Sequence, residues 1–307
     1  MTGKLRHALA RASMMTRLIV KGHILNPFWK GKQARRRVRY RATTDSVMRY
    51  LQMYAPAIRA MSAPIPPEPD AEPERVFTLW LQGEQHAPEV VKACFRSMRR
   101  HLSQELVVLD EKTLSDWISL PEDIIRKWKT GKMCAANFSD ICRLELLYRY
   151  GGIWMDATDY MTAPIPEYVE ESDFFVFKTG ERYGKWFSFI ESCFIRARKG
   201  DRLLAIWRNA VMEYWRHEES AIDYFINLIM LRFVVENNET AAEEFAHMPK
   251  VDHSQILDFW RYHGDDPYNA AEFERTMSNS FMKKTSYHTR HATATKAGSM
   301  AEHLINS

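Results

Sequence analysis

Residues 139–159, with the sequence SDICRLELLYRYGGIWMDATD, limit the possible folds of this chain more than any other segment. The segment opens with a helical pattern, and the pair Gly151 and Gly152 then ends the helix. A short apolar run follows and delivers Asp156 at its end. A helix, a glycine break, a buried strand and a carboxylate in direct succession are typical of an α/β domain, which binds ligands at the carboxyl ends of its strands.

The flanking sequence continues the alternation of helices and strands. Apolar runs predict strands at 76–81, 106–109, 153–155, 174–177 and 192–196. Helical patterns cover 88–101, 111–128 (as helical turns), 137–150, 202–216 and 221–236. Because helices separate most of the strands, we predict an α/β domain with a mainly parallel sheet over residues 74–285.

The two ends of the chain differ from this domain in composition. Residues 1–42 contain twelve Lys or Arg and no Asp or Glu, whereas the remainder contains 31 basic and 39 acidic residues. An apolar face along 5–19 predicts a basic amphipathic helical arm over residues 1–62. The Pro-rich acidic stretch 63–73 is predicted to be a linker. Residues 286–307, which are small, polar and His-rich, are predicted to be a flexible tail or a lid that orders on binding.

Composition excludes several classes of protein. Hydrophobic residues make up 46% of the chain and charged residues 27%, which is the balance of a folded globular protein. No apolar run is long enough to cross a bilayer, the basic N-terminus lacks an uninterrupted apolar segment for export, and the four cysteines form no CxxC pair. We therefore expect a cytoplasmic protein.

The basic segment 1–42 suggests a peripheral contact with the inner face of the membrane. Its aromatic residues and its amphipathic pattern favour an anionic lipid surface. Phosphates of nucleic acid also attract basic residues, so this alternative stays open, although no nucleic acid is expected.

Three residues of the central segment are suited to chemistry on a phosphate ester. Asp140 and Arg143 are three apart, which puts them on one face of the predicted helix, and Asp156 follows the strand. A nucleotide diphosphate sugar becomes more negative at its diphosphate as the glycosidic bond breaks, so its site needs a divalent cation or cationic side chains. A carboxylate at a strand end can hold Mn²⁺ or Mg²⁺, with phosphate oxygens and waters completing the coordination.

The same segment resembles the DxD-bearing region of glycosyltransferase family 32 and of the related capsular polysaccharide synthesis family. In these families a helix with Asp and Arg three apart precedes YGGIYxDxD. The residues that match in order are Asp140, Arg143, Tyr150, Gly151, Gly152, Ile153 and Asp156. The resemblance extends from about Trp80 to Pro166 and implies a GT-A-like, Rossmann-type nucleotide-sugar-binding domain. It also implies that Asp140 and Arg143 hold the donor's sugar hydroxyls and diphosphate, and that Asp156 takes the metal and the ribose.

The upstream sequence FTLWLQG, residues 77–83, is similar to the first strand of the GT-A fold. This similarity implies that Trp80 stacks on the nucleobase, with Gln82 and Gly83 adjoining it. Gly152 belongs to the same expected donor-binding set.

The chain departs from the DxD pattern at the second acidic position. Asp156 is followed by Ala157, Thr158 and only then Asp159. The predicted metal ligands are therefore Asp156 with Thr158 or Asp159, or Asp156 without a second ligand.

The sequence thus predicts a glycosyltransferase that moves a hexose-type unit from a nucleotide diphosphate sugar to a saccharide or lipid-linked acceptor in the synthesis of a surface polysaccharide such as capsule or lipopolysaccharide. Resemblance to family 32 implies retention of the anomeric configuration. Two alternatives remain. One is a hydrolase with Asp156 and Asp159 as its carboxylate pair, although glycosidases usually place their acids on different elements. The other is a non-catalytic membrane- or nucleic-acid-binding adaptor that uses the basic arm.

Overall fold

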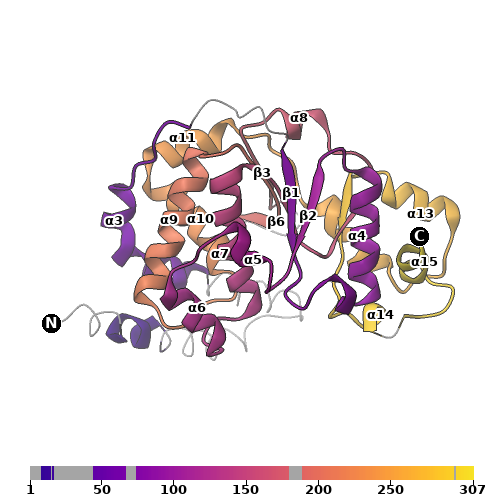
Figure 1. Cartoon of the computed structure of the whole chain (residues 1–307), viewed down its shortest axis with the longest axis horizontal. Coiled ribbons are helices and arrows are strands. Elements are labelled where there is room, and N and C mark those ends of the chain that lie inside the picture. Colours follow the sequence, from indigo (N-terminus) through magenta and orange to yellow (C-terminus); the bar gives the residue numbers. More distant parts are fainter. Residues whose placement is uncertain (1–7, 15, 17–43, 67–73, 180–188, 294) are drawn as a thin grey trace, which may run out of the picture.

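The computed structural model describes residues 8–14, 16, 44–66, 74–179, 189–293 and 295–307. A five-stranded sheet with strand order β2-β1-β3-β6-β5 lies at its centre (Figure 1). The strands are β1 (Arg75–Leu79), β2 (Glu105–Leu109), β3 (Gly152–Met155), β5 (Phe174–Lys178) and β6 (Ile190–Ala197). β1 pairs in parallel with both β2 and β3, whereas β6 is antiparallel to both β3 and β5. The predicted α/β class is confirmed, with a mixed sheet in which β6 alone runs against the other four strands.

Alternation of side chains along the strands gives the sheet an apolar core on each face. In β1, Phe77 and Leu79 face one core and Val76 the other; in β3, Trp154 faces the first core and Ile153 the second. The helices over the first core are α7 (Ala135–Tyr150), α9 (Arg202–His217), α10 (Ile226–Asn237) and α11 (Glu239–His247), and α4 (Glu89–His101) covers the second (Figure 1). Both faces of the sheet are therefore buried, which explains the nearly continuous apolar strands.

A second, two-stranded sheet brings the C-terminal part of the chain beside β3. It pairs β4 (Asp159–Met161) antiparallel with β7 (Met282–Lys284), and Asp159 lies opposite Lys284. The remaining helices are α3 (Ala55–Arg59), α5 (Leu114–Trp117), α6 (Glu122–Lys129), α8 (Glu167–Glu170), α12 (Ser254–Asp258), α13 (Ala270–Met277), α14 (Arg290–Thr293) and α15 (Met300–Asn306), with 3-10 turns at Gln52–Tyr54 and Glu84–His86 and a π-helical turn at Phe259–His263.

Most predicted elements occur within one or two residues of their expected bounds. The helical turns expected over 111–128 are two helices, α5 and α6, because the chain is extended at Ile118 and at Pro121, which caps α6. Helix α10 begins later than expected, at Ile226, because Asp223 accepts a hydrogen bond from the backbone N–H of Phe225 in a turn just before it.

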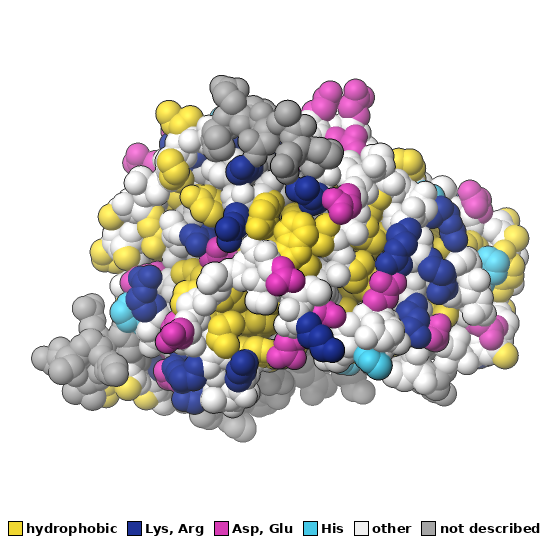
Figure 2. Space-filling model, in the orientation of Figure 1, with side chains coloured by type: hydrophobic (Ala, Val, Ile, Leu, Met, Phe, Trp, Pro, Cys, Tyr) yellow, Lys and Arg dark blue, Asp and Glu magenta, His cyan; other side chains and the backbone are white. Residues whose placement is uncertain are grey.

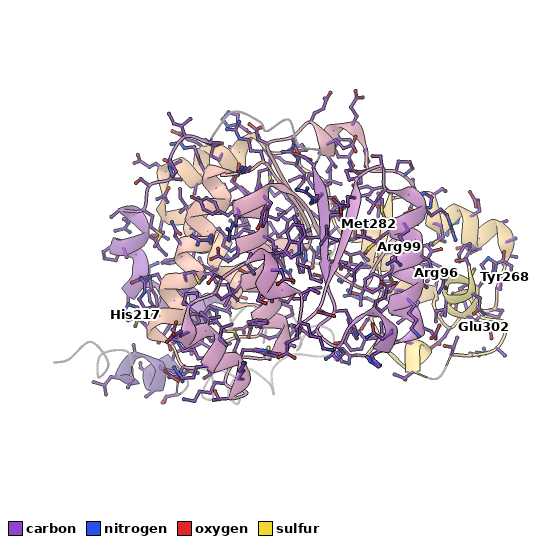
Figure 3. The ribbon with its side chains drawn as sticks, in the orientation of Figure 1. Arg96, Arg99, His217, Tyr268, Met282 and Glu302 are labelled. Carbon is purple, nitrogen blue, oxygen red and sulfur yellow. The ribbon has the colours of Figure 1, made fainter. Side chains whose placement is uncertain are left out.

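The prediction of a flexible tail over 286–307 is wrong for its described residues. Helix α15 packs against α4, and Met300 and Leu304 on it are fully buried. Apolar residues at helical spacing create this buried face, and the Ser299 side chain caps the helix by accepting from the Glu302 N–H. Figure 3 shows Arg96 and Arg99 on α4 with Glu302 and Tyr268 beyond them, and Arg96 donates a hydrogen bond to the Ile305 carbonyl.

The predicted arm over residues 1–62 is also corrected in part. Residues 44–51 are helical, and Val47, Leu51 and Ile58 are completely buried in the core that also contains α10. Asn238 fixes this segment further by donating to the carbonyls of Ile58 and Met61. Residues 44–61 therefore belong to the folded body.

Most of the basic segment lies outside the described residues, as does the linker over 67–73. Arg11, within the described helical stretch 8–14, pairs with Glu218 at 3.0 Å. No helix among the described residues has the length and apolarity to span a bilayer. On the face seen in Figure 2, basic and acidic side chains are interspersed with small hydrophobic patches.

Asp201 should make stability fall with rising pH. Its carboxylate caps α9, accepting from the Leu204 N–H at 2.7 Å, and burial raises its pKa to about 7. An unfolded Asp has a pKa of about 3.9, so between roughly pH 4 and 7 the folded chain binds more protons, and its stability declines by up to about 1.4 kcal/mol per pH unit.

Asp201→Asn retains an oxygen that can cap the helix but does not ionise. We expect the variant to exceed the wild type in free energy of unfolding at pH 8, by about 1–3 kcal/mol, and to equal it near pH 4, measured by urea denaturation. Equal stabilities at pH 8 would show that the capping bond of the carboxylate outweighs the cost of burying it.

Candidate functional site

The carboxyl ends of β1 and β3 form the edge of the sheet at which the predicted residues meet. These strands are parallel and in register at Phe77 and Trp154, so Trp80 and Asp156 leave the sheet at the same edge. The Asp156 N–H donates to the Cys193 carbonyl of β6 at 2.8 Å, which fixes the backbone where the carboxylate projects. The site is thus built on the rigid part of the fold.

Arg143 of α7 joins the two predicted carboxylates. Its Nη2 lies 3.3 Å from Asp140 Oδ1 and 3.1 Å from Asp156 Oδ1. Its Nη1 donates to the Ser192 carbonyl at 2.6 Å and to Ser192 Oγ at 2.9 Å, and Nη2 also reaches Ser139 Oγ. The side chain is 6% exposed, and these contacts are all to protein groups. This geometry suits a residue that positions the carboxylates.

Asp156 is held from two sides. Its Oδ1 accepts from Trp154 Nε1 at 2.8 Å as well as from Arg143, and its Oδ2 lies 2.7 Å from the ammonium of Lys284 in β7. Burial acts to raise the pKa of Asp156, but Arg143 and Lys284 outweigh it and hold this pKa below its usual value. Asp156 is therefore a fixed, ionised carboxylate with 26% of its side chain exposed.

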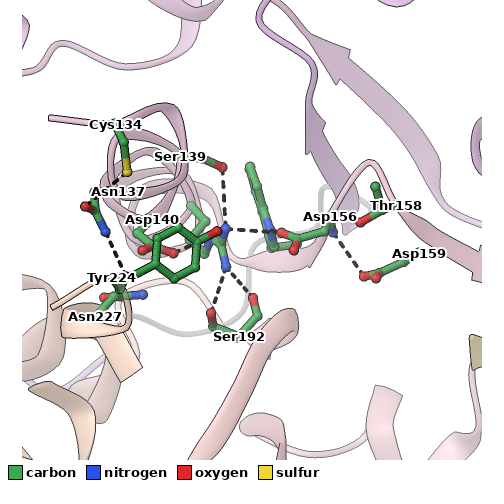
Figure 4. Close-up of polar contacts among 12 residues, drawn as sticks. Cys134, Asn137, Ser139, Asp140, Asp156, Thr158, Asp159, Ser192, Tyr224 and Asn227 are labelled. Atoms are coloured by element: carbon green, nitrogen blue, oxygen red, sulfur yellow. Dashed lines mark hydrogen bonds and ion pairs between the residues drawn. The ribbon is translucent and has the colours of Figure 1, made fainter. Parts of the chain in front are cut away.

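Thr158, in the turn between β3 and β4, and Asp159, the first residue of β4, lie beside Asp156 (Figure 4). Asp159 Oδ2 accepts from the Asp156 N–H at 3.1 Å, and Asp159 is completely buried. Burial raises the pKa of Asp159 to about 7, against the opposing effect of Lys284. Unlike Asp156, Asp159 presents no surface to a ligand.

Asp140 lies at the other side of Arg143, among side chains of α7 and of the segment that leads into α10 (Figure 4). Burial raises its pKa to about 6, although Arg143 and the neighbouring amides of Asn137 and Asn227 oppose this. Asn137 also donates to the Tyr224 carbonyl at 3.2 Å, and the exposed Tyr224 ring lies over this part of the site in Figure 4. A polar, half-enclosed wall thus surrounds Asp140.

The predicted nucleobase platform lies at the end of β1. The Trp80 ring meets the Tyr287 ring edge to face at 5.1 Å between centroids, and within the described residues its buried Nε1–H has no hydrogen-bond partner. Gly83 has a φ of 83° and closes a turn by donating to the Trp80 carbonyl at 2.8 Å, while Gln82 is exposed. These residues lie near one another at the edge, and their binding of a nucleobase stays a prediction.

Gly152 does not meet the other predicted donor-binding residues. It begins β3, four residues before Asp156, which is roughly 13 Å along a strand. A Cβ on Gly152 would lie 2.3 Å from the Arg75 carbonyl oxygen of β1. The close approach of two strands explains this glycine without a ligand.

Sequence comparison covers almost the whole described chain. Residues 28–304 match the family described as capsular polysaccharide synthesis protein. The chain belongs to this family. The predicted resemblance to it is therefore confirmed.

Two individual proteins are more distantly similar to this family member. Glycosyltransferase afumC of Aspergillus fumigatus is 25% identical over 191 residues, which span 57% of this chain and 46% of that protein. The match thus covers less than half of the length of afumC. The solved structure of the PaToxG glycosyltransferase superposes with a TM-score of 0.39 and 13% identity, over 66% of this chain and 79% of that one.

The predicted metal ligands do not fit a divalent cation in this arrangement. Oxygens of Asp156, Thr158 and Asp159 all lie within 3.1 Å of the Lys284 ammonium, so a metal ion bound there would have to displace it. In the part of the chain that the structure describes, no three His, Cys, Asp or Glu residues gather as a metal site would need.

Sequence reasoning missed Lys284, Ser192 and Tyr287. Each approaches the site from a distant element; Lys284 is 128 residues after Asp156. No local spacing signals such a contact. The sequence offers one sign of a cation at this position: the pair Lys283 and Lys284 comes directly after two apolar residues and before the polar tail.

Proposed function

We propose that this family member is a GT-A-like glycosyltransferase that moves a sugar from a nucleotide diphosphate sugar to a saccharide or lipid-linked acceptor in the synthesis of capsule or a similar surface polysaccharide. The observation that carries the proposal is the buried bridge from Asp140 through Arg143 to Asp156 at the carboxyl edge of the sheet. Open α/β sheets bind nucleotides at this edge. Membership in the capsular polysaccharide synthesis family supports the same assignment, as does the similarity to glycosyltransferase afumC.

Each group at the edge has a role in this proposal. Asp140, in its polar wall, accepts hydrogen bonds from hydroxyls of the donor sugar. Asp156 is oriented by Trp154 and Arg143, so its carboxylate is fixed before substrate binds, which lowers the cost of ordering the site. Trp80 is half-buried at the end of β1 and offers part of its ring to the nucleobase. Transfer of a hexose unit with retention remains a prediction from the resemblance to family 32.

A peripheral membrane contact through residues 1–42 is part of the proposal. Twelve basic residues without an acidic one favour an anionic surface, where a lipid-linked acceptor would be found.

The proposed function is tested by binding of nucleotides. Thermal unfolding would be followed with UDP, GDP, CDP, ADP or dTDP, each with Mn²⁺ and with EDTA. We expect one of them to raise the melting temperature, because a ligand at 100 times its Kd stabilises by about 2.7 kcal/mol. Asp156→Asn should weaken that ligand at least about tenfold, since it removes the charge that orders the site.

Asp116→Asn, on the exposed surface of α5, is the matched control and should leave binding unchanged. Absence of a shift with every nucleotide would contradict the transferase. Stabilisation by anionic vesicles or by RNA alone would then favour the adaptor, and release of sugar from a saccharide without any nucleotide would favour the hydrolase.

A further inference from the structure

We propose that the ammonium of Lys284 is the cation that receives the donor's diphosphate, in the place where a divalent metal is expected. The inference rests on the proposed glycosyltransferase function and names a residue that contacts its substrate. It also predicts that the nucleotide binds without metal.

The contacts of Lys284 coincide with the expected metal ligands. Its Nζ lies 2.7 Å from Asp156 Oδ2, 2.8 Å from Thr158 Oγ1 and 3.1 Å from Asp159 Oδ1. These are the same three residues that the sequence pattern indicates as metal ligands. The Lys284 ammonium thus contacts one oxygen of each residue. While it stays there, a divalent cation has no room to bind Asp156 Oδ2 or Thr158 Oγ1 at bonding distance.

The structure holds this lysine firmly. β7 pairs with β4 so that Lys284 is directly opposite Asp159, and the Thr285 N–H donates to the Thr158 carbonyl at 2.8 Å. The ammonium is therefore fixed among these oxygens before any ligand arrives.

Lys284 is better placed than Arg143 to meet a diphosphate. Both cations contact protein oxygens, but Arg143 is 6% exposed, whereas the Lys284 side chain is 21% exposed, beside the 26% exposed Asp156. Three carboxylates, Asp140, Asp156 and Asp159, accompany these two cations. A divalent ion added next to Lys284 would be repelled at short range by the positive charges of Lys284 and Arg143. The cluster therefore favours the cation that it already has.

The tyrosine that contacts Trp80 connects this cation with the nucleobase platform. Tyr287 follows Lys284 by three residues and packs against the ring of Trp80. A nucleotide with its base at Trp80 therefore has its diphosphate directed toward Lys284.

Lys284 would act on the leaving group. As the bond between the anomeric carbon and the diphosphate oxygen breaks, its electron pair goes to that oxygen, and the ammonium stabilises the added charge. The acceptor hydroxyl oxygen forms the new bond to the anomeric carbon, and its proton passes to the released diphosphate. One carbon–oxygen bond forms and one breaks, with no metal required.

Calorimetric titration of the nucleoside diphosphate panel into metal-free protein in EDTA, and into protein with Mn²⁺, tests the inference. For the wild type we expect the affinity of the preferred nucleotide in EDTA to be within about threefold of that in Mn²⁺. Lys284→Met should bind it at least about 30-fold more weakly in EDTA, because a charge-assisted contact to phosphate is lost. Lys284→Arg, which keeps the charge, should retain most of the affinity.

Lys283→Met is the matched control for loss of a buried lysine. Lys283 is on the opposite side of the same strand, where it donates to the Gln255 carbonyl at 3.0 Å, so its loss should change stability and leave nucleotide affinity unchanged. Circular dichroism would confirm that each variant is folded.

Three results would overturn the inference. If the wild type binds the nucleotide only with Mn²⁺, the metal site is real. If Lys284→Met binds as well as the wild type in EDTA, the lysine does not meet the diphosphate. If no nucleotide binds the wild type in either buffer, the proposed function fails and this inference with it.

Discussion

Arg143→Met is expected to lower the rate of sugar transfer by at least roughly 100-fold and the free energy of unfolding by about 3–5 kcal/mol. The substitution removes the guanidinium that touches both Asp140 and Asp156, and so leaves two carboxylates without this positive charge. The ring of Trp154 also loses a cation 5.0 Å from its centroid. Because the two carboxylates lose their common support, both kcat and KM should change.

Arg208→Met is the matched control. Arg208 also pairs with a carboxylate of α7, Glu145 at 2.8 Å, and lies over an aromatic ring, Tyr148, at 4.9 Å. Arg208 is more exposed than Arg143 and does not contact Asp156. Its loss should therefore lower the free energy of unfolding by about 1 kcal/mol or less and leave transfer unchanged. Arg143→Lys should recover only part of the activity, since an ammonium lacks the planar fork that reaches both carboxylates. Full activity in Arg143→Met with intact folding would remove this residue from the site.

The sequence predicted the central segment well because its contacts are local. Arg143 reaches Asp140 one helical turn away, and a glycine pair and a four-residue strand bring Asp156 back to it. Periodicity and spacing determine such an arrangement. The α/β class follows for the same reason, because β1, β3 and β5 are mainly apolar runs that are buried on both faces.

The remaining part of the site depends on long-range pairing, which spacing does not encode. Lys284 meets Asp156 only because β7 pairs with β4 after more than a hundred intervening residues. The sequence predicts a metal at Asp156 because its carboxylates are visible locally, whereas their partner Lys284 is not. Likewise, the polar composition of 286–307 obscured the four apolar residues that bury α15 against α4.

Gly152→Ala is expected to destabilise the protein by about 4 kcal/mol or more, one of the largest effects open to a single methyl group. Gly152 has a φ of 93°, where an L-residue is strained by about 1–3 kcal/mol, and the added Cβ would lie 2.3 Å from the Arg75 carbonyl oxygen. That oxygen belongs to the backbone of β1, so relief requires the two central strands to separate. We would measure the free energy of unfolding in urea.

Gly131→Ala separates the two causes of this loss. Gly131 has a φ of 71°, but nothing lies within 4 Å of a Cβ built there, so this variant should lose only the roughly 1–2 kcal/mol of backbone strain. The difference between the variants measures the clash between β1 and β3. Since Trp80 and Asp156 extend from these two strands, a Gly152→Ala protein that still folds should also bind nucleotide more weakly. Equal losses in the two variants would mean that the Arg75 carbonyl yields easily, and that the edge holding the candidate site is less rigid than its buried strands imply.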